Sequence, residues 1–251
     1  MQAQSTGTEV AGPGPSGLIV IDKGLRATSM DVCATVRARL RRGGAPKRVK
    51  VGHAGTLDPL ATGIVVVLVG KATRLCDKLM ATHKRYIAEI DLSRQSPTHD
   101  LERVAEPVEV KRVPTRDEVE AMLARFTGWI MQVPPIFSAL HVDGKRAYSL
   151  ARDGKPVDLP PRPIHIHSIA LIDYAFPLLT IDVSCGKGTY IRSLARDIGA
   201  ALETGGVLTA LRRTEVGVFG LEMAKRFDEL PDPMTGAELL DHTRFTVDEE
   251  E

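Results

Sequence analysis

One acidic side chain, Asp58, stands among small residues in the segment 52–63, GHAGTLDPLATG. Gly55 and Gly63 allow the backbone to approach a ligand closely, and Pro59 fixes the turn that follows the acid. Asp58 has no adjacent lysine or second acid that would indicate a structural ion pair. Two interpretations fit this spacing, a turn-forming or helix-capping side chain and a catalytic carboxylate, and the spacing does not decide between them.

Basic residues surround this segment. Residues 32–57 contain seven Lys and Arg and no Asp or Glu, although the net charge of the whole chain is only +1. The compensating charge lies in residues 228–251, which carry nine acidic groups against the single Arg244. An uninterrupted positive run suits a nucleic acid through phosphate contacts and counterion release, and a solvated helix face is the alternative.

The composition is that of a globular protein, with 43% hydrophobic and 26% charged residues. No apolar stretch approaches the roughly 18 residues of a membrane span, and the N-terminus lacks the pattern of a secretory signal, so we expect a cytoplasmic protein without membrane contact. Cys33, Cys76 and Cys185 have no metal-ligand spacing and are expected to be buried free thiols. The nucleotide-binding glycine patterns are also absent, so we expect neither a metal nor a cofactor.

The first half of the chain predicts two strands and two helices. Residues 1–16 are rich in Gly, Pro, Ser and Thr and predict a disordered leader. The apolar run 17–22 predicts a strand, and Thr28-Ser29 offers an N-cap for a helix ending at about residue 41. The β-branched run 64–70 predicts a buried strand, followed by a helix over about 72–82. Asp58 is therefore expected in a loop just before a buried strand.

Strands dominate the second half. Four are predicted, at 85–92, 138–142, 164–172 and 178–185, with the last two as neighbours and Asp143-Gly144 as a turn. Thr115 and Glu118 form a capping-box pattern for a helix to about Phe126, and apolar spacing predicts another helix over 189–202. Few strands are separated by the long crossovers of a parallel sheet. We therefore predict a mixed α/β (α+β) fold with a mainly antiparallel central sheet flanked by helices.

Several segments resemble the TruB family of tRNA pseudouridine-55 synthases. Besides GHAGTLDPLATG, these are GTYIRSLARDIG (188–199) and LTALRRTEVGVF (208–219), in the order found in the family. PPIFSALHVDGKRAY (134–148) and RPIHIHSI (162–169) also look like family segments, so the resemblance covers approximately residues 17–222. It implies a pseudouridine synthase fold and isomerisation of uridine at position 55 in the T-loop of tRNA, without a cofactor.

The resemblance also assigns roles to individual residues. Asp58 matches the catalytic aspartate, a task that suits a carboxylate because it can act as a nucleophile and then leave. Tyr86 matches the tyrosine that stacks on the base and can assist proton transfer, and Arg192 matches the arginine that pairs with the aspartate. Tyr190 and Leu211 match positions of the base pocket, and His53 matches a histidine that fills the gap left by the flipped base.

Phosphate contacts are expected around this pocket. Lys23 and Lys187 are predicted to bind substrate, and the basic run is predicted to contact the RNA backbone through Arg37, Arg41, Arg42, Lys47, Arg48 and Lys50. The partner implied is the T-arm of tRNA, bound by a monomer. Two alternatives stay open: a catalytic subunit guided by a separate RNA, and an RNA-binding or RNA-folding protein that retains the scaffold without turnover.

The chain departs from the family pattern in two places. We expect a catalytic domain over 17–227, then an acidic tail over 228–251 in place of an RNA-binding PUA module, and this tail is expected to be flexible or to pack on the body. In 91–102, DLSRQSPTHDLE replaces a glycine-containing stretch, and Thr98 and Asp100 look like remnants of it. This second change is expected to lie away from Asp58 and to alter loop geometry rather than chemistry.

Overall fold

The computed structural model describes residues 14–137, 141–142, 145–146 and 159–245. Its sheet strands are β1 (Gly17–Lys23), β2 (Val51–His53), β3 (Thr62–Val69), β4 (Lys84–Asp91), β7 (Gly128–Gln132), β10 (Arg162–Ala175), β11 (Leu178–Cys185), β12 (Val207–Val216) and β13 (Phe219–Gly220). Its α-helices are α1 (Ser29–Arg42), α2 (Cys76–Ala81), α3 (Arg116–Ala124) and α5 (Ile191–Ala201). Two short pairs, β5 (Arg94–Gln95) with β6 (Glu106–Pro107) and β8 (His141–Val142) with β9 (Lys145–Arg146), and four 3-10 segments complete the elements. No helix among the described residues is long and apolar enough to cross a membrane.

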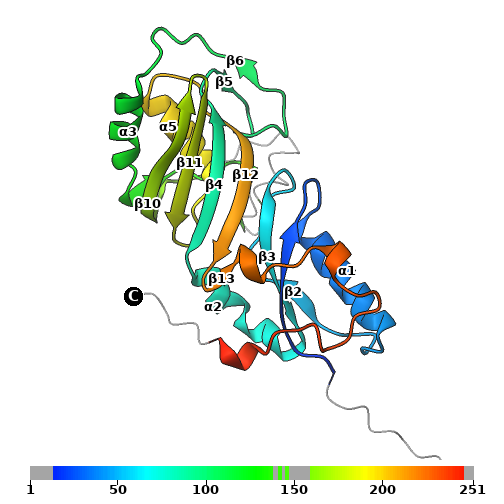
Figure 1. The fold of residues 1–251 in the computed structure, drawn as a ribbon. Coiled ribbons are helices and arrows are strands. Elements are labelled where there is room, and N and C mark those ends of the chain that lie inside the picture. Colours follow the sequence, from blue (N-terminus) through cyan, green and yellow to red (C-terminus); the bar gives the residue numbers. More distant parts are fainter. Residues whose placement is uncertain (1–13, 138–140, 143–144, 147–158, 246–251) are drawn as a thin grey trace, which may run out of the picture.

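One sheet runs through the whole molecule in the order β1-β3-β12-β4-β11-β10-β7, with β2 added to β3 and β13 to β12 (Figure 1). Its pairings are antiparallel apart from that of β12 with β3. The prediction of a mixed, mainly antiparallel sheet flanked by helices is confirmed, as is the neighbouring of β10 and β11. The predicted helix over 72–82 is instead a 3-10 segment, Gly70–Leu75, followed by α2. The predicted leader lies mostly outside the described residues, as do Asp143-Gly144 and the first three residues of the strand predicted at 138–142.

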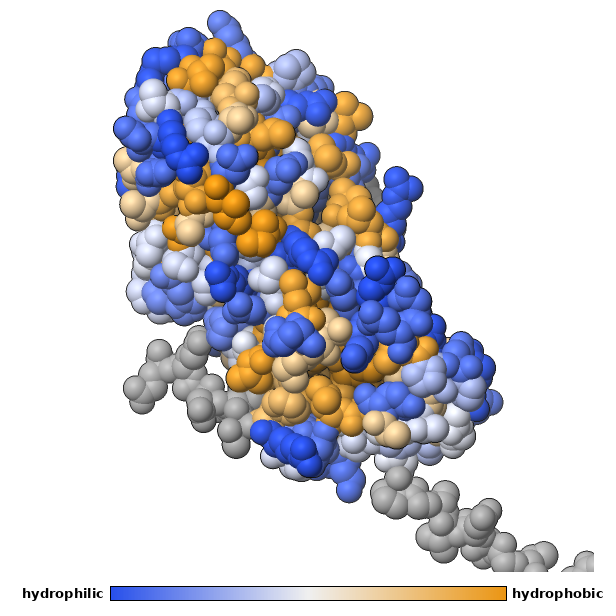
Figure 2. Space-filling model, viewed as in Figure 1, coloured by the Kyte–Doolittle hydropathy of each residue, from blue (hydrophilic) through white to orange (hydrophobic). Residues whose placement is uncertain are grey.

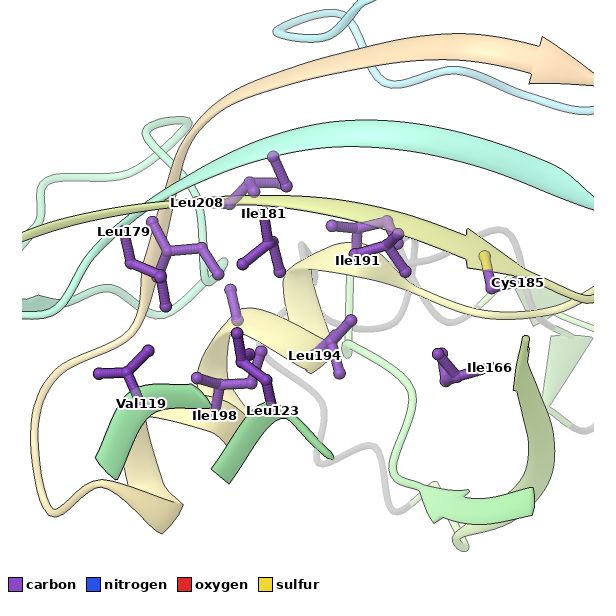
Figure 3. Close-up of a cluster of buried hydrophobic side chains, with 14 of the residues drawn as sticks. Val119, Leu123, Ile166, Leu179, Ile181, Cys185, Ile191, Leu194, Ile198 and Leu208 are labelled. Carbon is purple, nitrogen blue, oxygen red and sulfur yellow. The ribbon is translucent and has the colours of Figure 1, made fainter. Parts of the chain in front are cut away.

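The two halves of the sheet have separate cores. Helices α3 and α5 cover one face of β4, β11 and β10, where Figure 3 shows Val119, Leu123, Leu194 and Ile198 packed toward strand residues such as Ile181. In the other half, α1 packs on β1, β2 and β3. Strand β3 is buried on both faces, because alternate residues belong to two different clusters, and this explains its continuous apolar run.

The halves join where β12 pairs with β3. Arg213 lies opposite Gly63 in that parallel pairing, and Gly63 has a positive φ of 103°. A Cβ at Gly63 would lie 2.1 Å from the Arg213 carbonyl oxygen, so only glycine fits this junction. Tyr86 and Leu211 each pack against both cores. The junction is therefore the place where residues of the two halves meet.

The described part of the C-terminal segment packs on the body. Met234 is fully buried in the core beneath α1, and Leu240 pairs with Leu18 of β1 through backbone hydrogen bonds. The Arg39 guanidinium donates to the carbonyls of Phe227 and Leu230 at 2.8 and 3.0 Å. Figure 2 shows polar and apolar side chains interspersed over the side of the molecule drawn in Figure 1, without one dominant apolar patch in that view.

Candidate active site

Asp58 lies in the loop between β2 and β3, which is fastened to α1. The Leu57 N–H donates to the Ser29 hydroxyl at 2.8 Å, and that hydroxyl donates to the Leu57 carbonyl at 3.2 Å. The Asp58 carbonyl accepts from the Ala61 N–H at 3.0 Å, so Asp58 does open a turn. The Asp58 side chain is nevertheless 38% exposed, and the hydrogen bond of the turn is made by the backbone carbonyl alone. The turn-forming and the catalytic interpretations are therefore compatible.

Two buried cationic side chains donate hydrogen bonds to the backbone carbonyls of this loop. Arg213 is 1% exposed and donates to the carbonyls of Ile64, Thr56 and Gly55 at 2.7, 3.2 and 3.2 Å. Lys23 is also 1% exposed, and its ammonium donates to the carbonyl of Ala61. Burial lowers the pKa of Lys23 to about 8, with Asp58 opposing and Arg213 adding to the shift.

These positions correct one prediction and add one residue. The structure does not support Lys23 as a contact to an RNA phosphate, because its ammonium is enclosed under the loop. Lys23 lies two residues after Ile21 and four after Ile19 on β1, so it shares the strand face of these two buried residues. Arg213 was missed by the sequence analysis, although it shares a strand face with Leu211 by the same period.

Arg192 links Asp58 to a second carboxylate. This guanidinium, in the first turn of α5, is 6% exposed; its Nε lies 3.0 Å from Asp58 Oδ2 and its Nη1 lies 3.5 Å from Asp100 Oδ2. Its Nη2 donates to the Phe137 carbonyl at 3.1 Å. The structure thus brings together the predicted pair Asp58 and Arg192. A guanidinium held on several sides presents a fixed donor to the carboxylate.

The placement of Asp100 contradicts the expectation for the segment 91–102. Asp100 is 8% exposed on its side chain, is bridged to Leu208 of β12, and shares Arg192 with Asp58. Its carbonyl accepts from the buried Ser96 hydroxyl at 2.6 Å. The prediction that this segment lies away from Asp58 was wrong. The sequence of this segment gave no sign that Asp100 is buried against Arg192.

A cleft of about 510 Å³ opens beside Asp58 at the junction of the two halves. Its lining includes Asp58, Tyr86, Tyr190, Arg192, Leu211 and Arg213, so five of the predicted site residues share one cavity. Tyr86 is half-buried on β4, and burial raises the pKa of its hydroxyl, while the charge of Arg213 opposes that shift. The cleft therefore combines an ion-paired carboxylate with two aromatic rings and an apolar side chain.

Two other predicted substrate contacts lie near the cleft. His53 ends β2 half-buried and is not among the described residues that line the cleft; burial lowers the pKa of its imidazole, and Arg213 adds to the effect. Lys187 is exposed between Gly186 and Gly188, which both line the cleft. Lys187 is thus placed at the rim, and His53 lies at the end of β2, before the loop that carries Asp58.

Some of the predicted phosphate contacts are engaged in hydrogen bonds or ion pairs within the protein, and others are exposed. Arg37 donates to the Val51 carbonyl at 2.8 Å and Arg41 donates to the Lys47 carbonyl, so both brace the loop after α1. Arg42 forms a two-point ion pair with Asp232, at 2.7 and 2.6 Å. Lys47, Arg48 and Lys50 are exposed, and none of them forms an ion pair within the part of the chain that the structure describes.

The chemistry available at this site is that of a positioned carboxylate. Asp58 can act as a nucleophile or a proton acceptor toward a group held in the cleft, while Arg192 keeps its orientation. Among the described residues, no group of three or more His, Cys, Asp and Glu is arranged to hold a metal ion.

Comparison with known proteins adds to this geometry. Residues 42–191 match the model of the TruB family pseudouridylate synthase (N terminal domain), and residues 192–243 match that of the tRNA pseudouridylate synthase B C-terminal domain. The chain is similar to tRNA pseudouridine synthase B of Parabacteroides distasonis, with 44% identity over 86% of this chain and 92% of the relative. It is also similar to that of Mycobacterium avium, with 47% identity over 87% of this chain and 70% of the relative.

A solved structure shares the fold. The chain is similar to one in the crystal structure of a Cbf5-Nop10-Gar1 complex, with a TM-score of 0.65 and 29% identity. The match covers 85% of this chain and 53% of the solved one, so it spans about half of that longer chain.

Proposed function

The chain belongs to the TruB family of pseudouridylate synthases, and from this premise we propose that it isomerises uridine to pseudouridine in tRNA, with Asp58 as the catalytic carboxylate. The observation that carries the proposal is the 3.0 Å pair between Asp58 and Arg192 inside a cleft that also contains Tyr86, Tyr190 and Leu211. A carboxylate alone would not identify a reaction. Its pairing within a cavity fitted for a flat base supports this one.

The reaction is a rearrangement within one nucleoside. The bond from N1 of uracil to C1′ of ribose breaks, a bond from C5 to C1′ forms, the C5 proton leaves and N1 gains a proton. No oxidant, reductant or second substrate is consumed. Asp58 would begin the sequence as nucleophile or base, and Tyr86 lies in the same cleft, where it can stack on uracil and assist the late proton transfer.

The detached uracil must stay in place while it turns. The cleft supplies walls from both halves of the sheet, because Tyr86 lies on β4, Leu211 on β12 and Tyr190 at the start of α5. These walls would also receive a base extruded from a folded loop, which compensates for the lost stacking. We propose the T-loop uridine at position 55 as the target, with His53 entering the gap once the loop between β2 and β3 meets RNA.

The RNA backbone would contact the basic connection between α1 and β2. Lys47, Arg48 and Lys50 follow α1, and Lys187 lies at the cleft rim. We propose a monomer as the acting unit. We propose a cytoplasmic location, which a tRNA substrate supports.

The test is pseudouridine formation in a T-arm hairpin transcript, with purified protein and no other component. Wild type should convert the target uridine, and Asp58→Asn, which keeps the side-chain shape, should not. The similarity to the solved Cbf5 chain keeps an RNA-guided activity as the second candidate. That candidate predicts no conversion of the hairpin alone, and conversion only when a guide RNA and partner proteins are added.

A further inference from the structure

A buried amide holds the backbone of Tyr190. Gln132, the last residue of β7, is 1% exposed; its Nε2 donates to the Tyr190 carbonyl at 3.1 Å, and its Oε1 accepts from the Tyr190 N–H at 2.9 Å. The Gln132 side chain thus bonds both the backbone N–H and the backbone carbonyl of Tyr190, as a neighbouring strand would. Because Gln132 is buried and its amide bonds both backbone groups of Tyr190, it fixes the peptide planes on either side of that residue.

An arginine holds the ring of the same residue. Arg162 is the register partner of Gln132 on β10, so the two side chains start from adjacent positions of neighbouring strands. The Arg162 guanidinium lies 5.0 Å from the centre of the Tyr190 ring, and its Nη2 donates to the Gly188 carbonyl at 2.6 Å. Arg162 is not among the described residues that line the cleft, whereas Tyr190 is. Arg162 therefore supports the ring from outside the cleft.

Tyr190 needs this support because it starts α5. It is the N-cap residue, with an extended backbone (φ −106°, ψ 113°) and no hydrogen bond from its own side chain to the helix. Arg192, which pairs with Asp58, follows two residues later in the first turn. Any rotation of the backbone at Tyr190 would move both the ring and the guanidinium.

The chain that leaves β7 continues this support. The Val133 carbonyl accepts from the Ser193 hydroxyl at 2.9 Å and from Arg196 Nη2 at 3.0 Å, and the Phe137 carbonyl accepts from Arg192 Nη2 at 3.1 Å. Residues 132–137 thus run along the first turns of α5, and contact them through the Gln132 side chain and the backbone carbonyls of Val133 and Phe137.

We propose that Gln132 and Arg162 are positioning residues for the isomerisation, which set the Tyr190 ring against the uracil and keep Arg192 on Asp58. This inference rests on the proposed function. It assigns to the edge strand β7 a role in the rate of the reaction rather than in RNA affinity, since neither side chain lines the cleft.

The main test is Gln132→Met, which preserves side-chain length and removes both hydrogen bonds. We expect the single-turnover rate of pseudouridine formation at saturating hairpin to fall about 10- to 100-fold, since misplacement by about 1 Å can have that effect. The dissociation constant for the hairpin should change less than about threefold, because no RNA contact is removed. Phe219→Leu is the control: Phe219 is fully buried on β13 away from the cleft, so this variant should lower Tm and keep the wild-type rate.

Arg162 is tested by a double-mutant cycle with Tyr190. Arg162→Met should slow wild type, yet have almost no effect in a Tyr190→Ala background, because the ring that it supports is absent there. Equal slowing in both backgrounds would overturn the ring-supporting role of Arg162.

The outcomes separate the inference from the proposed function. If wild type makes no pseudouridine, the proposed function fails. If wild type is active and Gln132→Met keeps its rate, the positioning role of Gln132 is wrong. It is also wrong if the rate falls only in proportion to hairpin affinity, or if Phe219→Leu slows the reaction equally at the same Tm.

Discussion

Replacing Arg213 by lysine tests whether a buried guanidinium holds the loop that carries Asp58. Arg213 is 1% exposed, and its guanidinium donates to the carbonyls of Gly55, Thr56 and Ile64. A lysine ammonium is a single point at the end of its chain and cannot reproduce that fork. One or two of the carbonyls would therefore remain buried without that donor, and each would cost about 1–3 kcal/mol of stability.

The expected loss in free energy of unfolding is therefore about 1–6 kcal/mol, against the roughly 5–15 kcal/mol of net stability of a domain. Arg212→Lys, on the same strand, is the matched control. Arg212 is 39% exposed and pairs with Asp22 at 2.8 Å, so its replacement should cost about 0–1 kcal/mol.

Urea unfolding followed by circular dichroism measures both variants, with the slope of each transition checked against wild type. The hairpin assay should show a slower rate for Arg213→Lys below its unfolding transition, because the loop that carries Asp58 has lost its support. If Arg213→Lys and Arg212→Lys differ by less than about 0.5 kcal/mol, the reasoning about orphaned carbonyls is refuted.

Three further predictions concern other parts of the molecule. Because the pKa of Lys23 is lowered from 10.5 to about 8, the unfolded chain binds more protons between those values, so the Lys23 contribution to stability should rise with pH across that window. Urea unfolding at several pH values should show that rise in wild type relative to Lys23→Met, and a constant difference would contradict it. Met234→Ala should lower the free energy of unfolding by about 2–5 kcal/mol, since Met234 is fully buried under α1, and a loss below about 0.5 kcal/mol would mean that the C-terminal segment does not stabilise the body. Arg48→Glu with Lys50→Glu should weaken hairpin binding and reduce its salt dependence without changing the rate at saturation, and an unchanged salt slope would remove these side chains from the RNA contact.

The sequence predicted the fold well where one rule was sufficient. The alternation in 164–172 and 178–185 and the capping box at Thr115 each specify a local structure, and the structure has β10, β11 and α3 there. The predicted helix at 72–82 failed in part because Gly70 adopts a positive φ and the chain first turns as a 3-10 segment. Local propensity does not specify which helical form a short segment takes.

The candidate site was predictable only in part, for a physical reason. Asp58, Tyr86 and Arg192 were proposed through resemblance, whereas Gln132 and Asp100 contact partners far away in the sequence. No local pattern distinguishes a buried amide that clamps another residue from a polar residue at a strand end. For Lys23 a signal existed, since Lys23 lies at every second position of β1 with the buried Ile19 and Ile21, but its positive charge was taken as a sign of an RNA contact. Arg213 shares its strand face with Leu211, between the polar Thr209 and Glu215, and this pattern gives only a weak signal.

The measurement that tests the central claim most directly is the pseudouridine content of a T-arm hairpin after single-turnover incubation with wild type or Asp58→Asn. Both proteins should unfold at similar temperatures and bind the hairpin, so that the comparison isolates the carboxylate. The account predicts conversion of the target uridine by wild type and none by Asp58→Asn. Equal conversion by the two proteins would contradict the role of Asp58, and no conversion by wild type would contradict the proposed function.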